Sequence, residues 1–289
     1  MRALTRVLGR ALALTGALCA CGRSAVAPAG AREQPVQYEF TIRNSSGELL
    51  PAARFVAFAP VKHTATQETL ALTATEPFEL VTDALGNQAL HFQLELPPYG
   101  TKVIRVRATV ALRDEPVPEA LAASGEYLAA ARFVESGDPK IQAVAHQIGG
   151  SDPGDVAKRV ERWVGGHLED SGYEREDQGA LHALATGRGD CTEFMHLFVA
   201  LARARGIPAR EIGGFLAAQG EVPSARSYHN WAEVYLDGAW RVADPQRQVF
   251  GERASEYVAM RVLGATEADP LGNSQRFLAF DRVLDVRMN

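Results

Sequence analysis

The spacing of apolar residues changes once along the chain, and this change constrains the fold more than any other feature. From Val36 to Leu112 apolar residues recur at every second position, with turn signals between the runs. This pattern predicts short antiparallel strands with one buried face. After residues 113–118, which carry charges and two prolines, the spacing becomes helical. We therefore expect an α+β protein, with a small antiparallel β-sandwich over 36–113 and a second domain over 114–289.

The second domain is expected to begin with helices. Asp138-Pro139 and Asp152-Pro153 each place an N-cap residue before a proline at the first helical position, ahead of apolar residues at helical spacing. Asp177 is expected to cap a shorter helix that runs through Leu184. Strands are expected again after Ile207.

Cys191 is the one cysteine outside the first 21 residues. Asp190 before it is a good N-cap, and Gly206-Ile207-Pro208 ends the apolar pattern that follows. Cys191 therefore falls in the first turn of a helix, where free N–H groups and the helix dipole favour negative charge. Thiols in such positions ionise more readily than free cysteine, and the thiolate is the nucleophile. The backbone N–H of Cys191 is also a candidate donor to an oxyanion.

Two further residues are expected to meet on a β-hairpin. Asp237-Gly238 separates two strand-like runs and predicts a two-residue turn that sets Leu236 opposite Ala239. In this register His229 and Asp244 share a face and are diagonal neighbours, close enough for a hydrogen bond. A slip of one residue would place them on opposite faces.

Three blocks of sequence carry a family resemblance. They are Gly187-Arg188-Gly189-Asp190-Cys191, then Gly206-Ile207-Pro208-Ala209-Arg210, then His229-Asn230-Trp231 followed by Asp244-Pro245. Together they resemble the transglutaminase-like superfamily, which has a papain-type fold. The resemblance implies a catalytic triad with Cys191 as nucleophile, His229 as base and then acid, and Asp244 orienting the imidazole. It implies an enzyme that acts on peptide or protein amides through a thioester, by hydrolysis, deamidation or acyl transfer.

Several points stay open at this stage. Gln178 and Trp163 are candidates for the second oxyanion donor, although both also suit packing. A surface-tethered binding module that keeps the fold without catalysis is the alternative function. No metal site or cofactor is expected, since the sequence lacks Cys-x-x-Cys, His-Glu-x-x-His and EF-hand motifs. Loops at 214–226 and near Tyr173 are expected to set specificity.

The N-terminus predicts export. Arg2, Arg6 and Arg10 precede a short apolar run, as in a signal peptide over residues 1–20. Leu18-Cys19-Ala20-Cys21-Gly22 resembles a bacterial lipobox, which makes Cys21 the lipidated residue and 21–35 a flexible tether. Gly22 favours the periplasmic face of the outer membrane, so we expect a lipoprotein of the cell envelope.

The net charge of the processed chain argues against nucleic acid as a partner. Loss of residues 1–20 removes three of 30 Lys and Arg and none of 35 Asp and Glu, which leaves a formal charge of −8. A nucleic-acid-binding protein would normally carry a basic excess. We therefore expect a peptide or protein substrate, a lipid-mediated membrane contact and a monomer.

Overall fold

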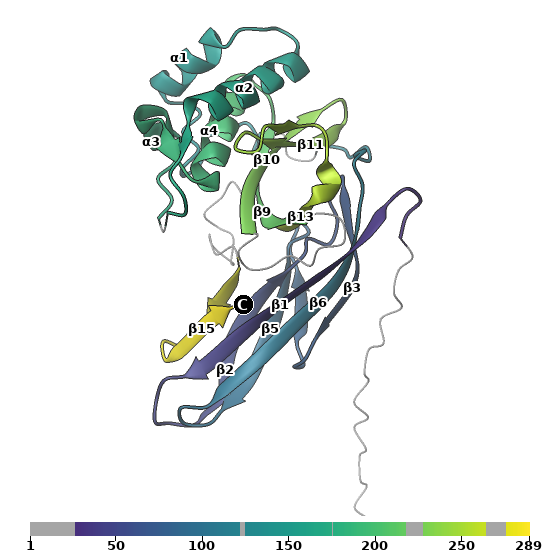
Figure 1. Cartoon of the computed structure of the whole chain (residues 1–289), viewed down its shortest axis with the longest axis vertical. Helices are drawn as coiled ribbons and strands as arrows, with labels where there is room; N and C mark the ends of the chain where they lie inside the picture. Colours follow the sequence, from purple (N-terminus) through teal and green to yellow (C-terminus); the bar gives the residue numbers. More distant parts are fainter. Residues whose placement is uncertain (1–26, 122–124, 175, 218–227, 264–275) are drawn as a thin grey trace, which may run out of the picture.

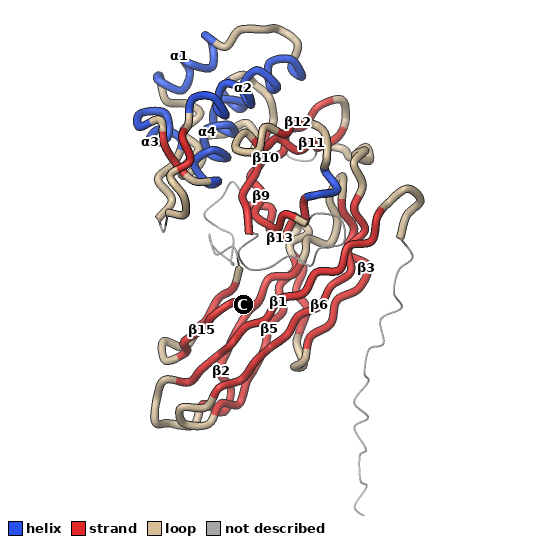
Figure 2. Tube along the Cα trace, in the orientation of Figure 1, coloured by secondary structure: helices blue, strands red, loops and turns tan. Residues whose placement is uncertain are grey.

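The fold has three parts that follow one another in space. A computed structural model describes residues 27–121, 125–174, 176–217, 228–263 and 276–289. Helices gather at one end, a β-sandwich forms the other end, and a five-stranded sheet lies between them (Figure 1). The α+β class is confirmed, and the helices and strands are segregated as Figure 2 shows.

The sandwich is built from two four-stranded sheets, in the orders β15-β1-β6-β3 and β14-β2-β5-β4. Its strands are β1 (Arg32–Asn44), β2 (Leu50–Ala59), β3 (Gln67–Ala74), β4 (Glu79–Thr82), β5 (Gln88–Leu96), β6 (Thr101–Leu112), β14 (Phe277–Ala279) and β15 (Leu284–Met288). The alternating apolar residues of β1, β2, β5 and β6 face inward and form one core. The period-two pattern thus fixed which face of each strand is buried.

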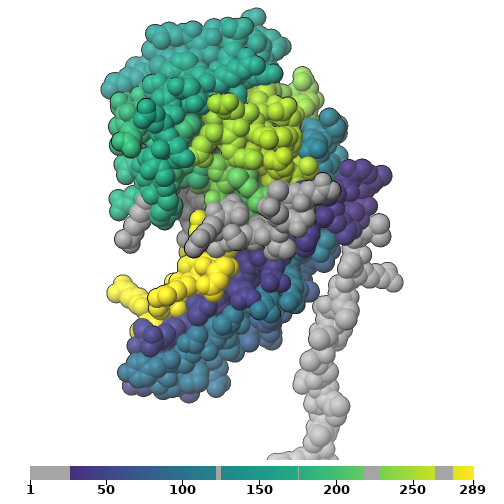
Figure 3. Space-filling view, viewed as in Figure 1, coloured from purple at the N-terminus to yellow at the C-terminus, as the bar shows by residue number. Residues whose placement is uncertain are grey.

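The sandwich includes two segments that the sequence analysis placed elsewhere, one near each end of the chain. β1 begins at Arg32, so residues 32–35, which were expected in the tether, pair with β6 instead. The alternation of apolar and polar residues does not reveal this part of the strand, because its buried side chain is the polar Gln34. At the other end of the chain, β14 and β15 pair with β2 and β1, although the 114–289 grouping placed them in the second domain. Figure 3 shows the C-terminal residues lying along the sandwich.

The helical end consists of four helices: α1 (Pro139–Gln147), α2 (Pro153–His167), α3 (Ala180–Thr186) and α4 (Cys191–Ala204). Asp138 and Asp152 accept hydrogen bonds at the starts of α1 and α2, as expected. Asp177 does not cap α3, because that helix begins two residues later than expected, after Gly179, whose φ of 87° suits glycine. α4 packs against α1, α2 and α3 and is buried along almost its whole length.

The sheet between the two ends is antiparallel in the order β12-β11-β10-β9-β13. Its strands are β9 (Ala209–Leu216), β10 (Tyr228–Leu236), β11 (Ala239–Asp244), β12 (Val249–Phe250) and β13 (Tyr257–Leu263), with the 3-10 turn η2 (Ala254–Glu256) before β13. α4 covers one face of β10, through Ala232 and Val234. Phe215 and Val258 of β9 and β13 join the sandwich core, so the sheet connects the two ends.

The short strands β7 (Glu169–Asp170) and β8 (Arg188–Gly189) form a parallel pair beside the start of α4. The predicted signal peptide and Cys21 lie outside the described residues, as do residues 218–226 of one predicted specificity loop. Within the described ranges, none of the helices is both long and apolar enough to cross a bilayer.

Candidate active site

Cys191 is the first residue of α4, and the loop before it is held tightly. The Asp190 side chain accepts from the backbone N–H of Thr192 at 2.7 Å, and Glu193 accepts from the N–H of Asp190 at 3.2 Å, which completes a capping box. Gly189 is required here, because a Cβ at that position would lie 2.3 Å from the Cβ of Glu193. The thiol is therefore fixed at the positive end of the helix dipole and is partly exposed.

The hairpin register predicted from Asp237-Gly238 is confirmed. Leu236 pairs with Ala239 and Ala232 pairs with Ala243, and both turn residues have positive φ, as a type I′ turn requires. His229 and Asp244 consequently share one face of the sheet. The Nε2 atom of His229 lies 2.7 Å from Oδ2 of Asp244.

The other side of the imidazole faces the thiol. Since Nε2 is engaged by Asp244, the ring's remaining nitrogen, Nδ1, is the one available for the side-chain hydrogen bond to Cys191. Burial lowers the pKa of His229, but the hydrogen bonds to Asp244 and Cys191 and their negative charges outweigh it and raise the pKa to about 9. An imidazolium in this position stabilises a thiolate on the neighbouring sulfur. The structure thus brings Cys191, His229 and Asp244 into one chain of hydrogen bonds.

Asp244 is itself held by residues that the sequence pattern did not reveal. Oδ2 also accepts from the hydroxyl of Tyr257 at 2.8 Å, and Oδ1 accepts from the backbone N–H of Arg247 at 3.2 Å. Burial and the Asp244 charge raise the pKa of Tyr257, so the phenol keeps the proton that it donates. Asp244 is 1% exposed. Its carboxylate is therefore buried with its hydrogen bonds satisfied and oriented toward the imidazole.

The imidazole is also positioned from the side. The His229 and Trp231 rings lie at 17° to each other with centroids 6.5 Å apart, and Trp231 packs against Tyr257. Gly214 pairs with His229 across the strands, and a Cβ there would lie 2.1 Å from the carbonyl oxygen of Val258 and 2.7 Å from the Trp231 ring. Glycine at 214 therefore allows β13 and Trp231 to approach closely beside the histidine.

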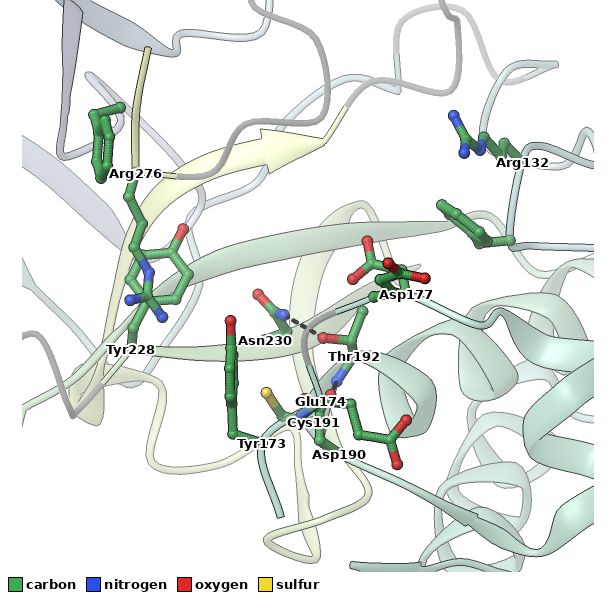
Figure 4. A pocket seen from close by; sticks show the side chains of 13 residues that line it. Arg132, Tyr173, Glu174, Asp177, Asp190, Cys191, Thr192, Tyr228, Asn230 and Arg276 are labelled. Carbon is green, nitrogen blue, oxygen red and sulfur yellow. Dashed lines mark hydrogen bonds between the residues drawn. The ribbon is translucent and has the colours of Figure 1, made fainter. Parts of the chain in front are cut away.

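Two cavities meet at Cys191. One, of about 670 Å³, is lined by Thr192, Asn230 and the acidic segment that contains Asp177. The other, of about 530 Å³, is lined by His229, Gln246 and Asp170. The residues common to both are Tyr173, Asp190, Cys191, Tyr228 and Arg276. Figure 4 shows the sulfur beside the Tyr173 side chain, with Tyr228 on the far side of that ring.

The two candidates for the second oxyanion donor lie elsewhere. Neither Gln178 nor Trp163 is among the described residues that line these cavities. Trp163 stacks on His167 in α2 at a centroid distance of 4.4 Å and packs against the helical core. The Gln178 backbone N–H donates to Glu193 at 2.9 Å, and its side-chain amide donates to the carbonyl of Glu176 at 3.4 Å. Both residues therefore serve local structure, as the packing alternative expected.

Comparisons with known proteins agree with this geometry. Residues 142–245, which include Cys191, His229 and Asp244, match the family model described as the transglutaminase-like superfamily. This segment is a transglutaminase-like core domain. The core so matched comprises most of α1, α2 to α4 and the sheet strands through β11.

Three individual proteins are similar to this chain. An uncharacterized protein of Mycobacterium leprae is 29% identical over 130 residues, which are 43% of this chain and 45% of that protein. The crystal structure of a "putative cysteine protease" from Cytophaga hutchinsonii has a TM-score of 0.62 at 21% identity and covers 90% of both chains, which shows a shared fold. The periplasmic domain of TgpA from Pseudomonas aeruginosa covers 73% of this chain and 88% of that domain, with a TM-score of 0.41 at 15% identity.

Proposed function

We propose that this protein is an exported cysteine-nucleophile enzyme that acts on peptide or protein amides through a thioester. The observation that carries the proposal is His229, which hydrogen bonds to Asp244 at 2.7 Å and to the Cys191 thiol. A nucleophile, a base and an orienting carboxylate in this order are the parts that nucleophilic catalysis requires.

The reaction follows from these positions. The Cys191 thiolate attacks the amide carbonyl carbon, and the negative charge moves to the carbonyl oxygen near the first-turn N–H of Cys191. The C–N bond then breaks while the imidazolium of His229 gives its proton to the departing nitrogen, which leaves a thioester on the sulfur. His229 next takes a proton from water, or from an amine, as that nucleophile attacks the thioester. The carbon–sulfur bond breaks and the thiolate returns.

The same proposal gives each side of the cleft a role. His229 lines the cavity of about 530 Å³ and protonates the leaving nitrogen, so the leaving group and the incoming nucleophile occupy that side. The acyl part of the substrate then extends into the cavity of about 670 Å³. Water as nucleophile gives hydrolysis or deamidation, and an amine gives acyl transfer.

The test is acylation of Cys191. The purified processed chain and Cys191→Ala are incubated with a panel of glutamine peptides and peptide amides, and intact mass is followed together with released ammonia or amine. We expect a thioester adduct on the native chain, none on Cys191→Ala, and a changed product when an amine is added. Iodoacetamide at pH 6 should also alkylate Cys191 faster than it alkylates the thiol of free glutathione. A slow, ordinary thiol with no adduct would favour the binding-module alternative.

We further propose that the protein is a monomeric lipoprotein of the cell envelope. The proposal rests on the basic and apolar residues of segment 1–20 and on Cys21 in its lipobox-like context. Labelling with radioactive palmitate should mark the native chain and not Cys21→Ser. Equal labelling of both, or none of either, would contradict it.

A further inference from the structure

The wall of the larger cavity opposite Tyr228 is acidic. The carboxylates that line this cavity belong to Glu174, Glu176, Asp177 and Asp190. Asp190 is used as the helix cap and as the acceptor for the N–H of Glu174, and Glu174 accepts from the Ser171 hydroxyl at 2.6 Å. For Glu176 and Asp177 the described part of the chain supplies no side-chain hydrogen bond or ion pair.

Two guanidinium groups line the same cavity without covering this wall. Arg132 lies over the Phe133 ring at 4.7 Å, and Arg276 lies over the Tyr228 ring at 4.4 Å. In Figure 4 Arg276 stands on the Tyr228 side and Asp177 on the opposite side, with the thiol between and below them. Partial burial raises the pKa of Asp177, and the nearby charges of Asp190 and Glu211 add to this, against His196 and Arg132. A cation beside Asp177 would therefore be stabilised.

An independent feature of the cavity also requires a hydrogen-bond donor. Asn230 is 6% exposed, and its Nδ2 donates to Thr192 Oγ1 at 2.9 Å, which fixes the amide plane. Its Oδ1 is buried and has no hydrogen-bond partner in the described structure. Figure 4 shows this oxygen turned away from Thr192, toward the space between Tyr228 and Asp177. A buried amide oxygen without a partner is destabilising, and a hydrogen-bond donor on a ligand would remove this cost.

We infer that the larger cavity selects acyl donors that carry a primary ammonium group on the acyl side of the scissile bond. Asn230 Oδ1 and the carboxylates of Glu176 and Asp177 accept its N–H groups, while Cys191 attacks the carbonyl at the mouth of the cavity. An ammonium supplies three donors and one positive charge, which suits one amide oxygen and two carboxylates. This inference rests on the proposed function, because it assigns the acyl group to this cavity.

Three p-nitrophenyl esters test the inference: 6-aminohexanoyl, hexanoyl and 5-carboxypentanoyl, which differ mainly at the end of the acyl chain. Acylation of Cys191 is followed by nitrophenolate release and intact mass. We expect the ammonium ester to react about 10- to 100-fold faster than hexanoyl, and the carboxylate ester to be slowest. Acylation at equal rates by all three would overturn the inference while leaving the nucleophile intact. No acylation above the Cys191→Ala background would instead refute the proposed function.

Substitutions test which residues cause the preference for the ammonium ester. Glu176→Gln/Asp177→Asn should reduce the ratio of ammonium to hexanoyl rates to below about threefold. Glu33→Gln/Glu95→Gln, which removes two exposed carboxylates from the sandwich, should leave the ratio unchanged. Asn230→Asp keeps an acceptor and adds a negative charge, so it should keep or raise the ratio, whereas Asn230→Leu should lower it. The native ratio should also fall as salt rises from 0.05 to 1 M. A ratio that resists both salt and the acidic-wall variants would overturn the inference.

Discussion

The sandwich differs in its buried polar residues from the other half of the fold, which consists of the four helices and the five-stranded sheet. The buried polar side chains described in the sandwich are neutral: Gln34, Asn44, Thr64, Thr66, Gln67, Asn87 and Gln88. In the other half most are charged or ionisable: Glu161, Asp190, Glu193, His196, Arg203, Arg210, Glu211, His229, Glu233, Asp244 and Arg261. Burying charge is costly unless it is paired. The part of the fold that buries these groups is also the part that holds the thiol, and it pairs several of them, as His196 with Glu211 and Arg210 with Glu233.

The largest expected effect is on catalysis and concerns Asp244. Asp244→Asn removes the carboxylate that orients His229 and raises its pKa, so the rate of Cys191 acylation should fall roughly 10³- to 10⁴-fold. The alkaline limit of the activity profile should also move below pH 9. Asp237→Asn, in the hairpin turn, loses the same charge and should stay within twofold. An Asp244→Asn rate within tenfold of native would break the comparison.

A pair of core truncations should separate the two halves next. Phe92 in the sandwich and Phe198 in α4 are both 1% exposed or less. Each Phe→Ala change should cost about 3–5 kcal/mol in free energy of unfolding, measured by urea denaturation. Below the unfolding transition, alkylation of Cys191 should keep its native rate in Phe92→Ala. It should slow in Phe198→Ala, because α4 carries the thiol. Equal slowing in both would show that the sandwich shapes the site.

The buried imidazole should make stability depend on pH. The pKa of His229 is about 9 when folded, against 6.5 for an ordinary histidine. The folded state therefore binds the proton more tightly. The resulting stabilisation is complete below pH 6.5 and is lost as pH rises through 9, by on the order of 3 kcal/mol. The difference in unfolding free energy between native protein and His229→Gln should shrink accordingly. A constant difference from pH 6 to 10 would contradict the raised pKa.

The smallest effect is expected at the sandwich surface. Arg105 and Glu39 form an ion pair across β6 and β1, with side chains 40% and 26% exposed. Such pairs are screened by water and salt, so Glu39→Gln should change the unfolding free energy by less than about 1 kcal/mol. Cys191 acylation should be unaffected. A loss of several kcal/mol would show that the sandwich also depends on charge pairing.

Local sequence predicted the parts of the site that local geometry determines. Asp190, Cys191 and Glu193 specify the start of α4, and Asp237-Gly238 sets the register that joins His229 to Asp244. Period two also places Asn230 on the face of β10 opposite His229. These features depend on residues within one helix turn or one hairpin.

The remaining parts depend on contacts between distant segments. Tyr257 reaches Asp244 because β13 pairs with β9, and no spacing in the sequence announces that pairing. Arg276 and Phe277 line the cavity because β14 returns to β2. Helical spacing likewise does not predict that the backbone N–H of Gln178 donates a hydrogen bond to the Glu193 side chain. These site residues were missed because they depend on strand pairing between segments far apart in the sequence, and not because the local signals were weak.

The return of the C-terminus to the sandwich has a practical consequence. β14 and β15 cover the outer edges of β2 and β1, and Asn289 is fastened to Glu39 and Thr41 by hydrogen bonds. A chain stopped after Leu263 would keep all three triad residues, yet it would uncover two rows of unpaired backbone groups that can recruit strands from other molecules. Expression of such a shortened form should yield aggregates, so deletion mapping of this protein should stay clear of its last fourteen residues.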